Sequence, residues 1–346
     1  MSTKISKKWK TGIIFFIFVG FLMSMTFVQL PYFAFKPGSV NELSRRIVVS
    51  KGKSFEPAGE IHFTTIKQDA SINGWEFLEG TFKDSVHLID EESILGTRNR
   101  DENQTFNFEL MRVSKSTAVA VALSHLGLDP YKATGIGIVA VEGPSKGNLT
   151  TSDVIVRVNG QDVFTDKDLI VQIRKFKPGD LIKLDVEQID GSDLREISIQ
   201  LGSREDDPSV AFLGISPQTR LEDNNDMPVN VLVNTGRIGG NSAGLALTLA
   251  VLDVLTPGEL TGGLQIATTG TIDLEGNIGP IGGVEQKTIT AREAGMDLFL
   301  VPENSFDKAI KHAGEMRIEG VSDLDDALQV LAQLGGNGDS LQLPKY

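Results

Sequence analysis

The chain has 346 residues, which is more than one small domain needs and enough for two or three. Hydrophobic residues make up 40% and charged residues 23%, a composition typical of globular proteins. The net charge of −13 argues against electrostatic binding of nucleic acid. The absence of cysteine excludes disulfides, thiolate metal sites and cysteine nucleophiles, and four histidines are too few to favour a multi-histidine metal centre. We therefore expect neither a metal nor a cofactor.

The N-terminal segment is apolar and long. Residues 11–35 carry no charged side chain, and at about 1.5 Å per helical residue they can cross a hydrocarbon core of about 30 Å. Four lysines within residues 1–10 predict a cytoplasmic N-terminus and an extracellular remainder. A cleaved signal peptide is the alternative, but the aromatic exit through Tyr32, Phe33 and Phe35 makes a poor cleavage site. We expect a retained, single-pass transmembrane anchor over residues 11–35, with the catalytic part outside the cell membrane.

Residues 36–112 carry a strand-like pattern but no chemical motif. Short strands are predicted over residues 46–50, 60–66 and 105–110, separated by polar loops. A small helix over residues 114–126 follows, with apolar residues on one side. The role of this β-rich region is open at this point.

The next region begins with Gly135, Ile136, Gly137 and Ile138, which open a strand. A second strand ends in an Asn159-Gly160 turn, and a helix over residues 166–176 and two alternating strands follow. This order resembles a PDZ domain, in which a Gly-Φ-Gly-Φ loop binds a peptide carboxylate through its backbone N–H groups. The resemblance implies peptide binding at these four residues, within a domain spanning residues 113–205. The alternative is that the two glycines only turn the chain.

A Gly-rich loop precedes an apolar helix in the C-terminal third. A strand over residues 229–234 leads to Gly240, Asn241, Ser242 and Ala243, and residues 242–255 then read as a buried helix. Asn241 is a good N-cap and would place Ser242 beside unpaired backbone N–H groups, where an oxyanion could be held. Ordinary capping by small residues explains the same pattern without catalysis.

A lysine lies on the small-residue face of the next predicted helix, over residues 284–295. Taking about 100° per residue, Lys287 shares a face with Val284 and Ala291, whereas Glu285, Gln286 and Arg292 occupy the other. Burial of a lysine lowers its pKa toward the range of a general base. The alternative is a lysine whose ammonium reaches solvent past the alanines.

Together these segments resemble the proteolytic domain of the Lon family of serine proteases. The resemblance rests on Ser242-Ala243-Gly244, on the run from Gly279 to Lys287, and on Thr269-Gly270. It implies a Ser242–Lys287 dyad with Thr269 orienting the lysine. With the anchor and the PDZ-like region, the chain is similar to the bacterial membrane-anchored, PDZ-containing Lon-like proteases. Asn241 and Gly239 depart from that pattern, where proline and aspartate are usual.

The expected fold is therefore α+β: a transmembrane helix, the β-rich region, the PDZ-like domain, a proteolytic domain over residues 206–334 and a polar tail over residues 335–346. Two further helices are expected over residues 305–312 and 322–334, the last capped by Ser322 and Asp325. No nucleotide-binding G-x-x-x-x-G-K-[ST] segment is present. Self-association into a ring is implied by the resemblance alone.

The sequence predicts an ATP-independent serine endopeptidase that cleaves flexible segments of exported or membrane proteins, with protein or peptide substrates as partners. Two alternatives stay open. One is an α/β-hydrolase in which Gly240 to Gly244 form a nucleophile elbow and His312 serves as the triad histidine. The other is a catalytically inactive scaffold that binds peptides through the PDZ-like region.

Overall fold

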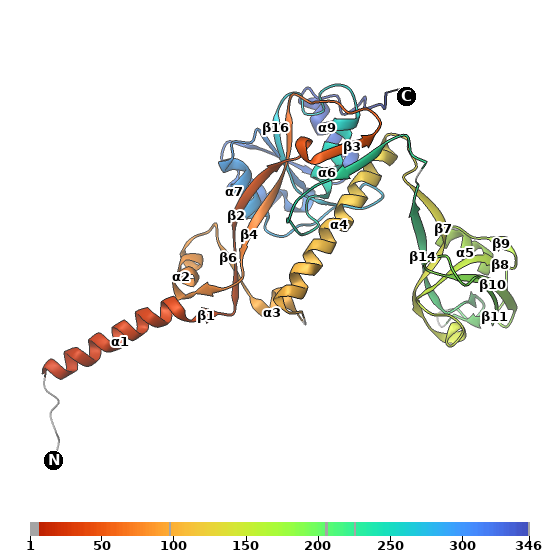
Figure 1. Cartoon of the computed structure of the whole chain (residues 1–346), viewed down its shortest axis with the longest axis horizontal. Helices are drawn as coiled ribbons and strands as arrows, with labels where there is room; N and C mark the ends of the chain where they lie inside the picture. The colour runs from red at the N-terminus through yellow and green to blue at the C-terminus, as the bar shows by residue number, and fades with distance from the viewer. Residues whose placement is uncertain (1–6, 97, 205–206, 225, 345–346) are drawn as a thin grey trace, which may run out of the picture. The chain divides into compact units, whose positions relative to one another are not determined.

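The computed structural model describes residues 7–96, 98–204, 207–224 and 226–344, and is drawn in Figure 1. The chain divides into two compact units, of which unit 1 comprises Met1–Leu128 and Pro228–Tyr346 and unit 2 comprises Asp129–Met227. Unit 2 is thus inserted between two halves of unit 1. The predicted boundaries at residues 112 and 205 are wrong, because the β-rich region and the helix after it belong to the same unit as the proteolytic segment.

A six-stranded sheet organises unit 1, in the order β20-β19-β16-β4-β2-β6. From one edge to the other, these strands are Arg317–Val321, Leu298–Pro302, Gln265–Thr268, Glu60–Asp69, Tyr32–Glu42 and His87–Asp90. The first four run parallel, and β2 is antiparallel to both β4 and β6. Strand β19 is buried along its whole length, as the continuous apolar run 298–302 requires of a parallel strand. The N-terminal half therefore supplies central strands of the sheet.

Smaller strand pairs surround this sheet. Strand β3 (Ile47–Lys51) pairs with β15 (Asn230–Val233), and β17 (Thr271–Ile272) pairs with β18 (Ile278–Gly279). The strands predicted over residues 46–50, 60–66 and 229–234 are confirmed, and the observed ends lie within three residues of the predicted ones. Residues 269–270 lie in neither strand, since β16 ends before them and β17 begins after them.

Helices cover the sheet. One side of it packs Ala267, Phe299 and Val301 against α7 (Val284–Glu293), as part of one apolar cluster. Alternate residues of a strand face opposite sides, so Ile266 and Leu300 point the other way, where α6 (Gly244–Leu255) contacts β4 and β16. Every residue of α6 is buried, which its apolar sequence predicts.

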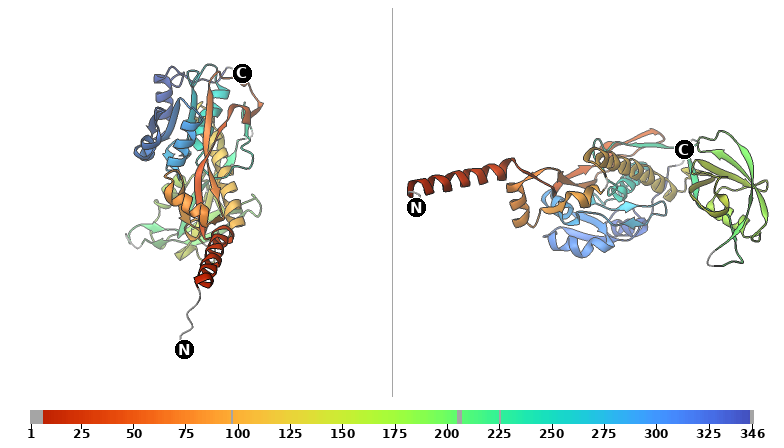
Figure 2. Two further views of the ribbon diagram at one scale, coloured as in Figure 1. Left: turned by 90° about the vertical axis from the view of Figure 1, so that its left-hand side faces the viewer. Right: turned by 90° about the horizontal axis from the view of Figure 1, so that it is seen from below.

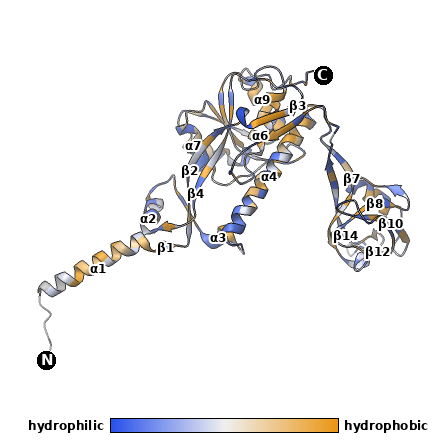
Figure 3. Ribbon diagram, in the orientation of Figure 1, coloured by the Kyte–Doolittle hydropathy of each residue, from blue (hydrophilic) through white to orange (hydrophobic). Residues whose placement is uncertain are grey.

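Helix α4 (Arg100–His125) packs beside α6, as Figures 1 and 2 show. It begins at a capping box, in which Asn99 and Glu102 exchange side-chain to backbone hydrogen bonds of 2.9 and 2.8 Å. Its first half is hydrophilic and its second half apolar (Figure 3), and buried residues recur at helical spacing along the second half. The predicted strand over residues 105–110 is wrong, because those residues form the exposed first half of this helix.

The N-terminal helix α1 spans Lys7–Phe27 and ends before Pro31, whose ring and missing N–H do not continue a helix. The chain then enters β1 (Gln29–Leu30) and β2, so residues 28–35 are not helical. Among the residues that the structure describes, no helix has both the length and the apolar character needed to cross a membrane. The predicted transmembrane anchor over residues 11–35 is therefore not supported. The extracellular placement depended on it and stays a prediction.

Short elements complete the N-terminal half of unit 1. They are the 3-10 turn η1 (Ser44–Arg46), strand β5 (Ile72–Asn73), and helices α2 (Gly74–Phe82) and α3 (Glu91–Leu95). Strand β5 pairs with β1, and Asn73 and Glu76 form a second capping box at the start of α2.

The C-terminal part of unit 1 contains η3 (Glu303–Ser305), α8 (Phe306–Ala309), η4 (Ile310–His312) and α9 (Leu324–Gln333). The helix predicted over residues 305–312 is thus split into three short pieces. Helix α9 is capped by Asp323, which accepts from the Asp326 N–H at 2.8 Å, rather than by Ser322 with Asp325.

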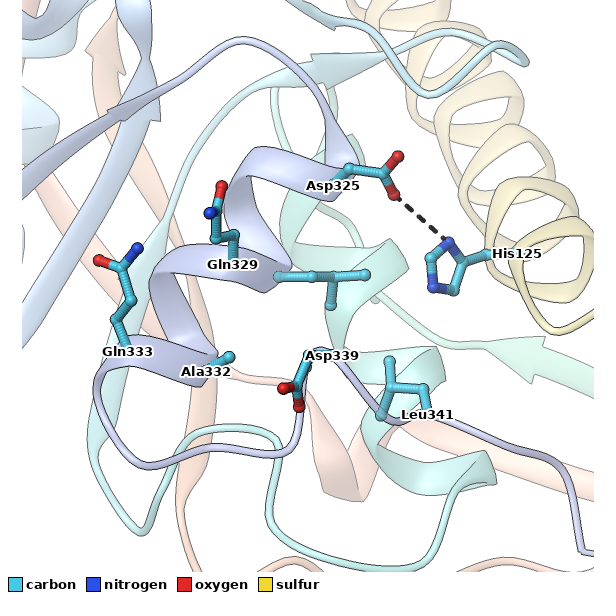
Figure 4. Close-up of a pocket in the computed structure, with 9 residues that line it drawn as sticks. His125, Asp325, Gln329, Ala332, Gln333, Asp339 and Leu341 are labelled. Atoms are coloured by element: carbon cyan, nitrogen blue, oxygen red, sulfur yellow. Dashed lines mark ion pairs between the residues drawn. The ribbon is translucent and has the colours of Figure 1, made fainter.

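The predicted polar tail packs back on unit 1, since the Asn337 side chain donates to the Pro257 carbonyl at 3.0 Å. Between α9, the tail and the end of α4 lies a pocket of about 700 Å³ (Figure 4). Asp325 and His125 form an ion pair of 3.8 Å at its rim.

Unit 2 is built on a five-strand path in the order β11-β10-β8-β7-β14, with β9 paired to β8. Its strands are β7 (Tyr131–Val141), β8 (Asp153–Val158), β9 (Gln161–Asp162), β10 (Leu181–Gln188), β11 (Arg195–Gln200), β12 (Gly202–Ser203), β13 (Ala211–Phe212) and β14 (Ile215–Asp223). Helix α5 (Asp166–Ile173) and the turn η2 (Gly143–Ser145) complete it. The predicted turn is confirmed, since Asn159 and Gly160 have φ of 48° and 77° between β8 and β9.

Candidate active site

Ser242 lies in the turn just before α6, and its backbone is held against the end of β16. Its carbonyl accepts hydrogen bonds from the Gly270 N–H at 2.9 Å and from the Thr269 hydroxyl at 3.1 Å. The Leu245 N–H in the first turn of α6 donates to the Gly270 carbonyl at 3.1 Å. The interruption between β16 and β17 thus supplies the groups that fix the serine.

Lys287 reaches the same point from α7. Its side chain is buried, with 3% of the residue exposed, and Nζ lies 2.7 Å from the Ser242 Oγ and 3.2 Å from the Thr269 Oγ1. The structure therefore brings together the three residues that the sequence singled out as nucleophile, base and lysine-orienting residue. Their catalytic roles stay a prediction.

Part of the predicted polar side of α7 is buried as well, although Arg292 is exposed as expected. Gln286 is 1% exposed and its amide donates to the Ser85 carbonyl, while Thr290 accepts from the Gly38 N–H at 2.9 Å. The helical wheel did not anticipate this, because the strands from the N-terminal half cover a face of α7 that the C-terminal segment alone would leave in water.

The environment of Lys287 favours the neutral amine. Burial lowers the pKa of Lys287 from 10.5 to about 7. No carboxylate among the described residues forms an ion pair with it, so nothing nearby restores the charge. Since the Thr269 hydroxyl donates to the Ser242 carbonyl, it accepts from Nζ. One N–H of the neutral amine is thereby used, and its lone pair is free to accept from the serine hydroxyl.

Helix α4 holds the loop on the other side of Ser242. The buried Ser114 hydroxyl donates to the Asn241 carbonyl at 3.2 Å, and the Gly240 N–H donates to the Asn107 carbonyl at 2.8 Å. A Cβ at position 239 would lie 3.0 to 3.1 Å from atoms of Asn107. This close approach explains why glycine stands there, where the family pattern has aspartate. Sequence patterns gave no signal for Asn107 or Ser114, because α4 is far from the loop in sequence.

Two details of the predicted loop are corrected. Asn241 is not the N-cap of α6, because the helix starts at Gly244 after Ala243, and no side chain caps it. The Gly240 N–H is not available to an oxyanion, because Asn107 accepts it. Within the described chain, the N–H groups of Asn241, Ser242 and Ala243 have no hydrogen-bond acceptor. No protein group therefore competes with a substrate oxyanion for these three donors.

A cleft of about 810 Å³ contains both Ser242 and Lys287. Residues of β2, β4 and α4 line it together with the loop that leads to Ser242. His312 is not among its lining residues. It lies in η4, where its carbonyl accepts from the Arg292 guanidinium at 2.9 Å. The alternative triad with His312 therefore has no support in the arrangement.

The residues predicted to bind a peptide carboxylate lie in unit 2, inside strand β7. Gly135, Ile136, Gly137 and Ile138 pair with β14, and Ile136 and Gly137 also pair with β8 on the other side. Ile136 and Ile138 are buried in the core of this unit. Residues 135–138 therefore form part of a paired strand rather than the expected loop, and their role in peptide binding stays a prediction.

Comparison with known proteins agrees with the C-terminal assignment. Residues 215–333 match the family model of the Lon protease (S16) C-terminal proteolytic domain. A Lon protease of Chloroflexus aggregans is 29% identical over 168 residues, which are 44% of this chain and 20% of that protein. A Lon protease of Campylobacter concisus is 34% identical over 95 residues, 26% of this chain and 12% of that protein. The chain thus spans a fifth or less of these relatives' lengths.

Solved PDZ domains are among the structures similar to part of this chain. The PDZ domain of an SdrC-like protein from Listeria monocytogenes has 21% identity, covering 24% of this chain and 87% of its own, with a TM-score of 0.22. That of an SdrC-like protein from Listeria innocua has 25% identity, covering 25% and 96%, with a TM-score of 0.23.

Replacing Ser114 tests whether α4 positions the nucleophile loop. In Ser114→Ala the Asn241 carbonyl loses its donor, so we expect kcat for peptide hydrolysis to fall roughly tenfold with little change in KM, because small misplacements of a reacting group are costly. Ser114→Thr keeps the hydroxyl and should restore most of the rate. Ser116→Ala, on the exposed side of α4, is the control. An equal loss in the Ala and Thr variants, or no loss in either, would contradict the assignment.

Burial of Lys287 should cost stability. The unfolded chain keeps the lysine proton between pH 7 and 10.5, whereas the folded chain has lost it, so wild-type stability rises with pH across that window. Lys287→Met removes this cost and should stabilise unit 1 by a few kcal/mol near pH 7, with the gain shrinking toward pH 10.5. Thermal unfolding over pH 6–10 measures it, beside the exposed control Lys308→Met. A gain that does not change with pH would count against a neutral buried lysine.

Proposed function

We propose that this protein is an ATP-independent serine endopeptidase in which Ser242 is the nucleophile and Lys287 the general base. The observation that carries the proposal is the 2.7 Å contact between the Ser242 Oγ and the Nζ of a buried lysine that has no carboxylate partner among the described residues. The match of residues 215–333 to the Lon proteolytic domain supports it. The sequence contains no phosphate-binding loop, which favours hydrolysis without nucleotide.

The reaction follows from the positions of these groups. Neutral Lys287 takes the proton of the Ser242 hydroxyl as Oγ attacks the scissile carbonyl. The N–H groups of residues 241–243 have no acceptor among the described residues and belong to Ser242 and its chain neighbours, so they would stabilise the developing oxyanion. Lys287 then gives its proton to the leaving amine, which breaks the C–N bond and leaves an acyl-enzyme.

Deacylation uses the same base. A water molecule gives a proton to Lys287 as it attacks the ester, and Ser242 recovers its hydrogen when the acid product leaves. Thr269 keeps the lysine lone pair aimed at Oγ, since it receives one Nζ–H and is itself fixed by the Ser242 carbonyl. Thr269 is thus a positioning residue.

Flexible protein segments are the proposed substrates. An extended chain rises by about 3.3 Å per residue, so a cleft of about 810 Å³ suits a short unfolded stretch rather than a folded domain. Because the chain contains no nucleotide-driven unfolding motif, folded proteins should resist cleavage except at their loops and tails.

Cleavage of a disordered protein tests the dyad directly. Wild-type protein should produce fragments, detected on gels and by mass spectrometry, and both Ser242→Ala and Lys287→Ala should reduce the rate by at least about a thousandfold, because the nucleophile and its base act as a unit. Lys308→Ala, which removes an exposed lysine of α8, should cleave at the wild-type rate.

Cleavage that persists in both dyad variants would overturn this mechanism. Binding of a peptide without turnover by the wild-type protein would instead favour the inactive scaffold. The full chain is the sample to use, because segments from both halves of the chain line the cleft.

A further inference from the structure

The cleft that contains Ser242 and Lys287 has a charge opposite to that of the whole chain. The protein carries a net charge of −13. Besides Lys287, however, three arginines line the cleft (Arg98, Arg100 and Arg237), against one acidic side chain, Asp101, among the described lining residues. The same walls carry five phenylalanines, of which Phe35, Phe106 and Phe108 are partly or largely exposed and Phe33 and Phe63 are buried behind them. The lining is therefore both apolar and cationic.

Two of the three arginines have no acidic partner. Arg100 is already paired, because its Nε lies 2.7 Å from the Glu91 carboxylate. Among the residues that the structure describes, no carboxylate forms an ion pair with Arg98 or Arg237. Arg237 is exposed and lies in the loop that ends at Ser242. A charge left unpaired in such a loop is available to whatever occupies the cleft.

Arg98 is held in place without a counter-ion. Its guanidinium carbon lies 4.2 Å from the centre of the Phe106 ring, a cation–π contact that fixes the plane of the group. Its Nε is buried and has no hydrogen-bond acceptor in the described chain. Arg98 as a whole is partly exposed and lines the cleft, so its guanidinium brings a charge without an acidic partner to the cleft.

We propose that the cleft selects peptide segments with an aspartate or glutamate within a few residues of a large apolar side chain. Arg98 and Arg237 bind the carboxylate, and the phenylalanine-rich wall takes the apolar group. This inference rests on the proposed peptidase function and names its substrate class. Guanidinium groups match the planar carboxylate with two parallel hydrogen bonds, which makes arginine better suited than lysine to this task.

The position of Arg237 limits where the acidic residue lies. Arg237 precedes Ser242 by five positions in the same loop, and both line one cleft. An extended substrate advances about 3.3 Å per residue, so a carboxylate at this arginine belongs to a residue only a few positions from the scissile bond. A distant acidic tail would not make the same contact.

Matched peptides test the selection. Three quenched fluorescent peptides, identical except for Glu, Gln or Lys two or three positions from one phenylalanine, are assayed with the full chain. The variants are Arg98→Gln, Arg237→Gln and the double variant. Arg112→Gln is the control: it removes the same charge from α4, at a residue outside the cleft that pairs with Glu109. Thermal unfolding confirms that each variant is folded.

We expect kcat/KM for the Glu peptide to exceed that for the Gln peptide by on the order of tenfold. This is the difference expected when one partly desolvated, charged hydrogen bond is gained. The Lys peptide should be the slowest. The preference should fall toward one in the double variant, stay intact in Arg112→Gln, and weaken with added salt. Equal rates for the three peptides in the wild type, or a preference that survives in the double variant, would overturn the inference.

A binding measurement separates this inference from the peptidase proposal. Fluorescence anisotropy of the same peptides with Ser242→Ala measures affinity when no cleavage can occur. Tighter binding of the Glu peptide, lost on adding the two arginine changes, supports the inference even if no peptide is ever hydrolysed. Hydrolysis of all three peptides with equal affinities would leave the peptidase standing and remove the acidic preference.

Discussion

The removal of one lysine side chain from water is the constraint on which the proposed chemistry depends. In water Lys287 would be protonated at neutral pH and could not accept a proton from serine. Burial lowers its pKa to about 7, and the absence of a carboxylate partner among the described residues keeps it there. An acidic neighbour would reverse this, because it would stabilise the ammonium. The residues around Lys287 thus decide its protonation state, on which the proposed role as a base depends.

The fold provides that environment by joining segments from both halves of the chain. Ser242 lies in the turn before α6 and Lys287 lies in α7, on opposite sides of the sheet, and Thr269 at the end of β16 contacts both residues. The N-terminal half supplies β2 and β4 beside β16 and the helix α4 that holds the nucleophile loop. The insertion of unit 2 after α4 therefore leaves unit 1, which contains the candidate site, discontinuous in sequence.

The parts of this arrangement that could be predicted are those encoded locally. The apolar run of α6 and the position of Lys287 on α7 each follow from a short stretch of sequence, and the combined spacing of Ser242, Thr269 and Lys287 carried the family resemblance. What could not be predicted depends on distant segments. The first half of α4 has no apolar periodicity, so the sequence carries no helical signal there. The Gly135–Gly137 pattern looked like a loop because β14, which pairs with it, lies about eighty residues later.

The N-terminus illustrates the same limit in a different form. Composition alone treated residues 11–35 as one apolar segment, whereas the helix stops at Phe27 and the following residues join the sheet through β2. Asn241 is another case: its residue type favours an N-cap, but Gly270 and Thr269 already bind the neighbouring backbone, so α6 begins without a side-chain cap. At Asn241, tertiary hydrogen bonds to the neighbouring residue thus overrode the local preference for a cap.

The pH dependence of Ser242 acylation is the measurement that tests the neutral-lysine mechanism most directly. Single-turnover acylation of the full chain by an activated ester peptide is followed from pH 5 to 10, in wild type and in Thr269→Val. The mechanism predicts a rate that rises about tenfold per pH unit at low pH and levels off above an apparent pKa near 7. Thr269→Val should lower the plateau. A rate that is still climbing at pH 10, or that does not depend on pH, would contradict a buried neutral lysine as the base.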